Sequence, residues 1–357
     1  MNRRFYLKLA VLAMLVCGII SCKKEVKVTS VQLNETALTL YVGDTATIIA
    51  TIQPADAAER GLNWSSNNNN VASVWNGTIT AKSEGTATIT ATTRDGNKTA
   101  QCKVTVINSF HPAVPEMVWV EGGTFTMGCT DGELNVAGQI SPYEIPTHQV
   151  TLSSFKMAKY LVTQKQWELV MGTTINQQRE KMGYSEMYGE GDNYPMYYVS
   201  WQDAQDFINK LNELTRKKYR LPTEAEWEFA ARGGNNGKNN NHKYSGGNDI
   251  DAVAWYYDEY SDSYEMTTKP VGTKAPNELG IYDMSGNLWE FCSDLFEYYT
   301  EQPQTNPVGR GAYNNHVIRG GCFGNKATQC RVSYRRDGDY YVYERGLLFG
   351  IRLVLVE

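Results

Sequence analysis

Between residues 26 and 107, short runs of Thr, Val, Ile and Ala alternate with polar residues, and this pattern restricts the fold more than any other feature of the chain. A period of two is typical of strands with one buried face. We expect strands at residues 38–42, 46–52, 77–81 and 87–91, with turns at Gly43-Asp44, Asn76-Gly77 and Asp95-Gly96 between them. Many short strands at this spacing predict an all-β sandwich, with Trp64 in its core.

The chain changes character between residues 109 and 115, where two prolines interrupt any periodicity, so we place a domain boundary there. The first domain then covers residues 26–107 and the second covers residues 115–357. In the second domain we expect three short helices, each after a Thr or Ser cap, at residues 164–171, 201–216 and 224–232. The rest is rich in Gly, Asn and aromatic residues, so aromatic packing, polar networks or ions must hold this domain together.

The N-terminus has the form of an export signal. Basic residues precede a short apolar run at residues 9–20, which is too short to span a hydrocarbon core of about 30 Å. The sequence Ile19-Ile20-Ser21-Cys22 resembles a lipobox, so we expect residues 1–21 to be removed and Cys22 to carry a lipid anchor. The alternative is an ordinary signal with an incidental cysteine. The expected location is a bacterial cell envelope, anchored to the outer membrane on its periplasmic or surface face.

Charge and cysteine content further limit the possible functions and disulfides of the protein. The chain has 34 Lys and Arg against 39 Asp and Glu, and removal of the leader takes three basic residues away. An acidic chain without a basic stripe is a poor nucleic-acid binder. Export allows disulfides among the remaining cysteines, but their odd number leaves at least one thiol unpaired. They are Cys102, Cys129, Cys292, Cys322 and Cys330.

Two resemblances cover most of the chain. The first domain resembles the bacterial group 2 Ig-like domain through Leu40-x-Val42-Gly43, Trp64-Ser65-Ser66 and the runs 71–74 and 85–91. That resemblance implies a spacer or adhesive module without catalytic residues. The second domain resembles the formylglycine-generating-enzyme (sulfatase-modifying factor) family through residues 117–128, 146–150, 199–204, 220–234 and 277–290, then Arg319-Gly320-Gly321 and Gly350-Ile351-Arg352.

The second resemblance implies an α+β fold of low regular content, related to the C-type lectin fold, and a calcium site. The implied ligands are the Asp283 and Glu290 carboxylates and the Gly286 and Leu288 carbonyls. A hard cation needs several oxygens from a tight turn, which this segment offers. The alternative is that the two carboxylates satisfy backbone amides.

Catalytic members of that family bind copper(I) through two cysteines five positions apart and oxidise a sulfatase cysteine to formylglycine. Here the second position is Cys330, but the first is Asn325. One thiolate is a weak copper(I) site. Cys322 stands where the family has a serine, so an oxidase that uses Cys322 and Cys330 remains an alternative, beside a disulfide or a buried thiol. Another branch of the superfamily uses an iron site of three histidines. That alternative is weaker, because no pair of histidines in this chain has ligand spacing.

The segment between residues 325 and 344 suggests a binding function instead of an oxidase activity. Tyrosine and arginine gather between framework motifs, a composition typical of recognition surfaces. The candidate ligand-binding residues are Asn325, Tyr334, Arg335, Arg336, Tyr340, Tyr341 and Tyr343. The architecture resembles lipoproteins diversified by retroelements, although a surface loop with fortuitous aromatics has the same composition. We therefore predict a non-catalytic binding or scaffold module for an unknown protein or glycan ligand.

Overall fold

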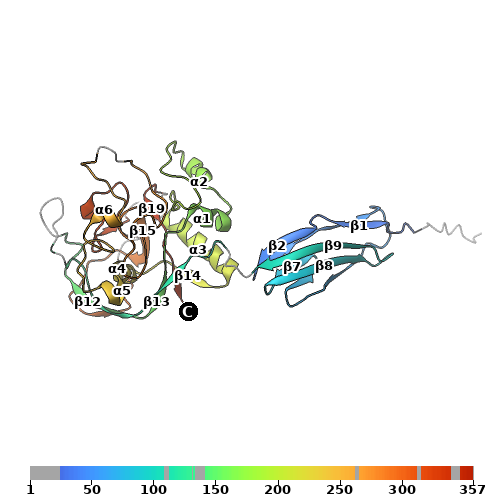
Figure 1. Cartoon of the computed structure of the whole chain (residues 1–357), viewed down its shortest axis with the longest axis horizontal. Helices are drawn as coiled ribbons and strands as arrows, with labels where there is room; N and C mark the ends of the chain where they lie inside the picture. Colours follow the sequence, from blue (N-terminus) through green and yellow to red (C-terminus); the bar gives the residue numbers. More distant parts are fainter. Residues whose placement is uncertain are drawn as a thin grey trace, which may run out of the picture. The chain divides into compact units, whose positions relative to one another are not determined.

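The computed structural model describes residues 25–107, 112–130, 132, 141–261, 265–311, 315–338 and 346–356 (Figure 1). These residues fall into two compact units, divided after residue 109. The predicted leader and its Cys22 lie outside the described residues. Within the described ranges, no helix has both the length and the apolar character needed to cross a membrane.

The first unit is an all-β sandwich, as predicted. Its strands are β1 Ser30–Leu33, β2 Ala37–Tyr41, β3 Thr45–Thr47, β4 Ala50–Gln53, β5 Leu62–Ser66, β6 Ala72–Trp75, β7 Thr78–Ala81, β8 Gly85–Thr93 and β9 Thr99–Ile107. They form sheets in the orders β2-β9-β8-β5, β3-β7-β6 and β1-β4. The β2–β9 pair is parallel, whereas the other pairs in this unit are antiparallel.

Alternation along β8 shows why this sequence forms a sandwich. Ala87, Ile89 and Ala91 are buried, while the threonines between them are partly exposed. Opposite them, Cys102 and Val104 of β9 complete the core. Trp64 packs against this core without being fully buried.

One strand prediction needs correction. The single strand expected at residues 46–52 is two strands, because the chain leaves one sheet for another. Residue Ile48 donates its amide to the Gly77 carbonyl beside β7, whereas the Ile49 amide donates to the side chain of Asn34. The chain then continues as β4, which pairs with β1.

The second unit is a mixed α+β fold with short elements. Its strands are β10 Met117–Val120, β11 Gly123–Met127, β12 His148–Leu152, β13 Phe155–Ala158, β14 Lys218–Arg220, β15 Trp289–Leu295, β16 Gln304–Thr305, β17 His316–Arg319, β18 Arg335–Asp337, β19 Phe349–Gly350 and β20 Val354–Val356. They form sheets in the orders β10-β13-β20-β14, β11-β12-β16 and β18-β17-β15-β19. The C-terminal strand β20 therefore lies inside a sheet that begins with the first strand of the unit.

The helices are α1 Gln164–Met171, α2 Ile175–Met182, α3 Trp201–Thr215, α4 Glu224–Ala231, α5 Gly234–Gly237 and α6 Ile250–Val253, with a 3₁₀ turn at Ala327–Gln329. The three predicted helices start at the predicted caps, and each cap closes a capping box. Helix α2 was not predicted, because its sequence has no apolar stripe; Thr174 caps it and Gly183 ends it.

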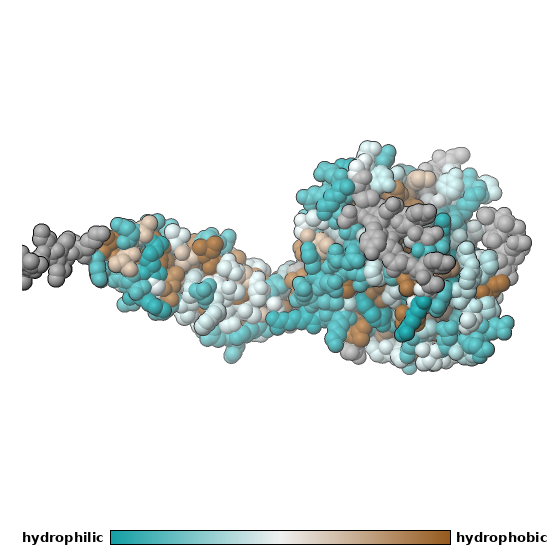
Figure 2. Space-filling model, turned by 180° about the vertical axis from the view of Figure 1, so that it is seen from behind, coloured by the Kyte–Doolittle hydropathy of each residue, from teal (hydrophilic) through white to brown (hydrophobic). Residues whose placement is uncertain are grey.

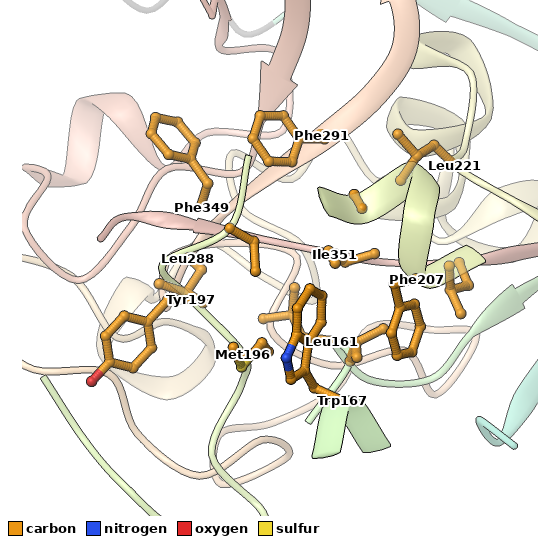
Figure 3. Close-up of a cluster of buried hydrophobic side chains, with 14 of the residues drawn as sticks. Leu161, Trp167, Met196, Tyr197, Phe207, Leu221, Leu288, Phe291, Phe349 and Ile351 are labelled. Atoms are coloured by element: carbon orange, nitrogen blue, oxygen red, sulfur yellow. The ribbon is translucent and has the colours of Figure 1, made fainter. Parts of the chain in front are cut away.

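The apolar core of this unit lies among α1, α3 and the central strands. Figure 3 shows Trp167, Phe207 and Leu161 packed together in it. The rings of Trp167 and Phe207 are stacked, with centroids 5.5 Å apart and planes 4° apart. On the face drawn in Figure 2, apolar residues form scattered patches on a mostly hydrophilic surface.

Buried arginines make up the other part of this core. The Arg352 guanidinium donates through Nε and Nη2 to the two oxygens of Glu290, at 2.8 and 2.7 Å. Arg319 pairs with Glu228, which also accepts from Arg232. Arg331 makes a two-pronged pair with Glu144, at 2.9 and 2.8 Å. Paired charges of this kind hold the interior of the unit together with its short strands and helices.

Candidate functional site

The loop after β17 carries the cysteines of interest. Gly321 has φ +72°, and a Cβ added to it would lie 2.8 Å from the Cys330 sulfur, so glycine lets the turn close on Cys330. Cys322 donates both its backbone N–H and its thiol to Asn325 Oδ1, each at 3.0 Å. Asn325 Nδ2 in turn donates to Gln329 Oε1 at 3.2 Å. Asn325, which stands where the family resemblance implies the first copper thiolate, is thus held by Cys322 and Gln329.

The two thiols are poor copper ligands in this setting. Both are fully buried, and burial raises the pKa of the Cys322 thiol to about 12 and that of Cys330 well above its usual value. Neither is in a disulfide, and the same holds for the other cysteines of the described ranges. Copper(I) binding requires two soft thiolates, so one thiol beside an amide oxygen does not fit that ion.

In the turn at residues 283–290, both carboxylates of the predicted calcium site have partners within the protein. Both oxygens of Glu290 accept from Arg352, and Glu290 Oε2 also accepts from Trp227 Nε1 at 2.6 Å. Asp283 Oδ2 accepts from the Gly272 amide at 2.8 Å, and burial raises the pKa of Asp283 to about 6. Glu290 therefore leaves the predicted ligand set, because a cation there would have to displace Arg352. The Asp283 carboxylate and the Gly286 and Leu288 carbonyls remain of the predicted set, and we derive no function from calcium.

No group of three or more His, Cys, Asp or Glu side chains in the described ranges is placed to hold a metal ion. Two of the histidines that the structure describes pack against aromatic rings. The His316 ring stacks on Trp201, with centroids 3.9 Å apart, and burial lowers the pKa of His316. The His148 ring packs edge-on against Tyr299.

The tyrosine- and arginine-rich segment is only partly described. Tyr340, Tyr341 and Tyr343 lie outside the described residues. Tyr334 is half-buried, and its ring centroid lies 6.0 Å from that of Trp289. Arg336 is exposed, as a ligand-binding residue should be.

Arg335 corrects the prediction, because its side chain is buried. Its Nε and Nη2 donate to the two carboxylate oxygens of Glu224 at 2.6 and 2.7 Å. Its Nη1 donates to the carbonyls of Tyr143 and Glu297 at 3.2 and 2.8 Å. Arg335 is therefore a residue that positions two loops, and it does not lie on the surface of the domain.

A cavity of about 280 Å³ lies beside the cysteine loop. Trp255, Tyr256 and Phe323 supply its aromatic wall, and the Tyr257 amide donates to the Asn325 carbonyl nearby, at 2.7 Å. The Lys274 ammonium lies 4.2 Å from the centroid of the Trp255 ring. Aromatic surface with a few polar groups is typical of a small-ligand pocket.

Sequence reasoning missed the acidic partners of the framework arginines. Glu224 and Glu228 lie in α4, whose residues are all buried, so each carboxylate needs a cation inside the protein. The signal was present in the sequence, because three glutamates among the apolar residues of one short helix imply buried partners.

The comparisons with known proteins agree with this framework. Residues 103–356 match the profile of the sulfatase-modifying factor enzyme 1-like domain, and residues 27–104 match the bacterial Ig-like domain of group 2. The chaperone protein LppX of Paenibacillus barcinonensis is 34% identical over 242 residues, which are 55% of this chain and 77% of that protein.

Two further relatives support the fold and the family. A formylglycine-generating enzyme of Streptomyces coelicolor is 34% identical over 158 residues, 40% of this chain, and the match spans about half (47%) of that protein. The solved structure of PvdO from Pseudomonas aeruginosa gives a TM-score of 0.55 at 28% identity, covering 70% of this chain and 97% of that chain. The α+β prediction is confirmed, and the chain belongs to the sulfatase-modifying factor enzyme 1-like family, with an Ig-like domain of bacterial group 2 ahead of the family domain.

Proposed function

We propose that the C-terminal domain is a non-catalytic binding module. One observation carries the proposal: the Asn325 amide stands in the first copper-ligand position and accepts from both the backbone and the thiol of Cys322. A thiol held in this way, with its pKa raised to about 12, is neither a ready nucleophile nor a ready metal ligand. The family framework thus persists around a loop in which Asn325 replaces one of the two copper-binding cysteines of catalytic members.

The surface around the loop after β17 is where we place the ligand. Asn325 is half-buried, Arg336 is exposed, and the cavity beside Phe323 lies next to the same loop. In that cavity Lys269 is already paired with Glu265, with 2.6 Å between Nζ and Oε2. The paired Lys269 and Glu265 side chains can contact a ligand without taking part in a reaction. One relative is named a chaperone protein, which favours a binding function for this domain.

We also propose that the chain is an exported lipoprotein. The lipobox-like sequence at Cys22 supports an anchor, and the Ig-like unit is suited to hold the binding domain away from the membrane. Metabolic labelling with a fatty-acid analogue tests this, with a Cys22→Ala variant as the matched control. Label that is lost in the variant supports the anchor, whereas equal label in both chains contradicts it.

The test of the non-catalytic proposal is a conversion assay. The reduced, purified chain receives copper(I), oxygen and a peptide that contains Cys-x-Pro-x-Arg, and mass spectrometry reads the peptide. A formylglycine-generating enzyme assayed in parallel is the positive control. We expect an unchanged peptide, because one thiolate does not hold copper(I) for this reaction. Formylglycine that disappears in a Cys330→Ser variant would establish the alternative, an oxidase that uses Cys322 and Cys330.

A further inference from the structure

A second cavity, of about 370 Å³, lies away from the cysteine loop and is not used by the proposals above. Its wall is aromatic and its rim is charged. Tyr143, Phe296 and Tyr298 form the wall, and Glu297, Arg310 and Asp337 stand around it. Asp337 is the last residue of β18, so the cavity borders the segment where sequence analysis places the ligand surface.

The three rings form a continuous apolar surface. The Tyr143 and Phe296 rings meet edge to face, with centroids 5.1 Å apart and planes at 86°. The Tyr298 ring lies 5.7 Å from Tyr143 and 6.3 Å from Phe296, again centroid to centroid. Tyr298 is 65% exposed, so its ring is accessible from solvent. These rings pack against one another at distances that leave no room for a ligand between them, so a ligand would lie on their outer surface.

The buried Arg335 holds this wall in place from behind. Its guanidinium carbon lies 4.4 Å from the centroid of the Phe296 ring. Its Nη1 donates to the carbonyls of Tyr143 and Glu297, which lie in the two loops that carry the rings. Because Glu224 fixes the other side of the same guanidinium, the wall is preorganised before any ligand arrives.

The charged rim, in contrast, has no partners within the described part of the protein. Among the residues that the structure describes, none forms an ion pair or hydrogen bond with the side chain of Glu297, Arg310 or Asp337. Glu297 and Arg310 are exposed, and Asp337 is half-buried. The cavity therefore presents free acceptors and free donors of opposite charge beside an apolar wall.

This combination selects a ligand chemistry. An ammonium group would suit the carboxylates but would place a like charge beside Arg310, and an anionic group would meet the reverse conflict. A hydroxyl donates to a carboxylate and accepts from a guanidinium without carrying a charge. The apolar C–H face of a sugar ring can also lie flat on an exposed tyrosine.

We propose that this cavity binds a neutral saccharide, with Tyr298 as the stacking platform and Arg310 and Asp337 as the hydrogen-bonding groups. Its volume is at the small end of the range for ligand pockets, which favours one or two sugar rings. The proposal deepens the proposed function and rests on it only in that the domain binds a ligand; it does not depend on the state of the cysteines.

The test uses the purified full chain and a panel of neutral disaccharides: cellobiose, maltose, lactose and N,N′-diacetylchitobiose. Glucosamine and glucuronic acid are the charged comparison. Saturation-transfer NMR at millimolar sugar detects binding, and calorimetry gives the affinity. We expect at least one neutral disaccharide to bind, and Tyr298→Ala to weaken it roughly tenfold through loss of the stacking surface.

Arg310→Ala is the second variant, because its side chain is exposed and its loss spares the core. We expect it to weaken binding by roughly tenfold as well, through loss of charged hydrogen bonds. Lys210→Ala is the control, since Lys210 of α3 is exposed, is not among the residues that line the cavity and is no part of the proposed ligand surface. Its affinity should equal that of the parent chain.

Three results would overturn the proposal: no neutral disaccharide binds, only the charged sugars bind, or binding is equal in the parent and in both cavity variants. Failure here is distinguishable from failure of the proposed function. An unchanged Cys-x-Pro-x-Arg peptide together with absent sugar binding rejects the saccharide alone. Peptide conversion together with sugar binding that needs Tyr298 rejects the non-catalytic role and leaves the cavity assignment standing.

Discussion

The two units of this chain fill their cores in opposite ways. In the described part of the Ig-like unit, Thr93 is the one polar residue that is buried, and Val, Ile, Leu, Ala and Cys102 supply the apolar core. The family domain instead buries whole ion pairs, such as Arg352 with Glu290 and Arg331 with Glu144. Strand alternation is sufficient to bury an apolar core, whereas a domain of short strands needs fixed polar partners.

In the family domain, the buried ion pairs maintain the fold and are separate from the residues of the copper positions. The motif residues Arg319 and Arg352 are fully buried in ion pairs with Glu228 and Glu290. They hold α4, β15 and β17 together, and the proposed ligand binding does not depend on their contacts. Family motifs of this kind can therefore persist after a copper position has changed to Asn325. Membership of the family shows the framework, and the residues of the site must show the activity.

The largest expected effect comes from breaking a buried pair. Arg352→Met should destabilise the family domain by about 3–5 kcal/mol, because it leaves the Glu290 charge buried without its partner. Arg220→Met is the matched control: Arg220 pairs with Glu226 but is 38% exposed, so we expect about 1 kcal/mol or less. Urea unfolding followed by tryptophan fluorescence measures both. Equal losses in the two variants would show that burial of the pair is not what stabilises the domain.

The Ig-like unit should respond to a cavity instead of a charge. Ile89→Ala removes a fully buried side chain from β8, and we expect a loss of about 3 kcal/mol in the unfolding of that unit. Ile49→Ala is the control, because Ile49 is 63% exposed and its loss should change little. Calorimetry of the full chain resolves which transition moves. A shift of the family-domain transition in Ile89→Ala would contradict the assignment of separate cores.

The smallest expected effect is a pH dependence from a buried carboxyl. Burial raises the pKa of Asp294 to about 6, above the ordinary 3.8, although the Gly309 and Glu224 amides donate to it. The folded state therefore keeps this proton at a higher pH than the unfolded state does. Its stabilising contribution is complete below about pH 4 and is lost as the pH rises through 6.

An Asp294→Asn variant isolates that contribution. The free energy of unfolding of the parent chain, minus that of the variant, should rise by roughly 2–3 kcal/mol as the pH falls from 7 to 4. Urea unfolding at each pH measures the difference. A difference that stays flat, or that falls with decreasing pH, would show that Asp294 titrates near its ordinary value in the folded state.

Much of the fold was predictable from sequence, for reasons that particular residues make clear. Three helices were predictable from their N-cap residues Thr163, Ser200 and Thr223, because an N-cap side chain bonds to the backbone of the first helical turn. Alternation along β8 predicted the sandwich. The split into β3 and β4 was not predictable, since it depends on the bond from Ile48 to Gly77, a contact between distant parts of the chain.

The site was harder to predict. Arg335 and Arg336 are adjacent and chemically identical, yet one is buried against Glu224 and the other is exposed. Neighbours in a strand point to opposite faces, and composition cannot tell which face is the inner one. The aromatic cavity was missed for a similar reason, because Tyr143 and Phe296 are far apart in sequence and come together only in the folded domain, where Arg335 contacts both of their loops.

The central claim is that the family framework here has lost its copper chemistry, and a copper(I) titration against a competing chelator tests it most directly. The parent chain is compared with Cys322→Ser and Cys330→Ser, all reduced and in the absence of oxygen. We predict that the parent takes up no tightly bound copper(I) and that the three curves coincide, because Asn325 replaces one thiolate and burial keeps Cys322 protonated. One equivalent of tightly bound copper(I) that is lost in both variants would contradict the account.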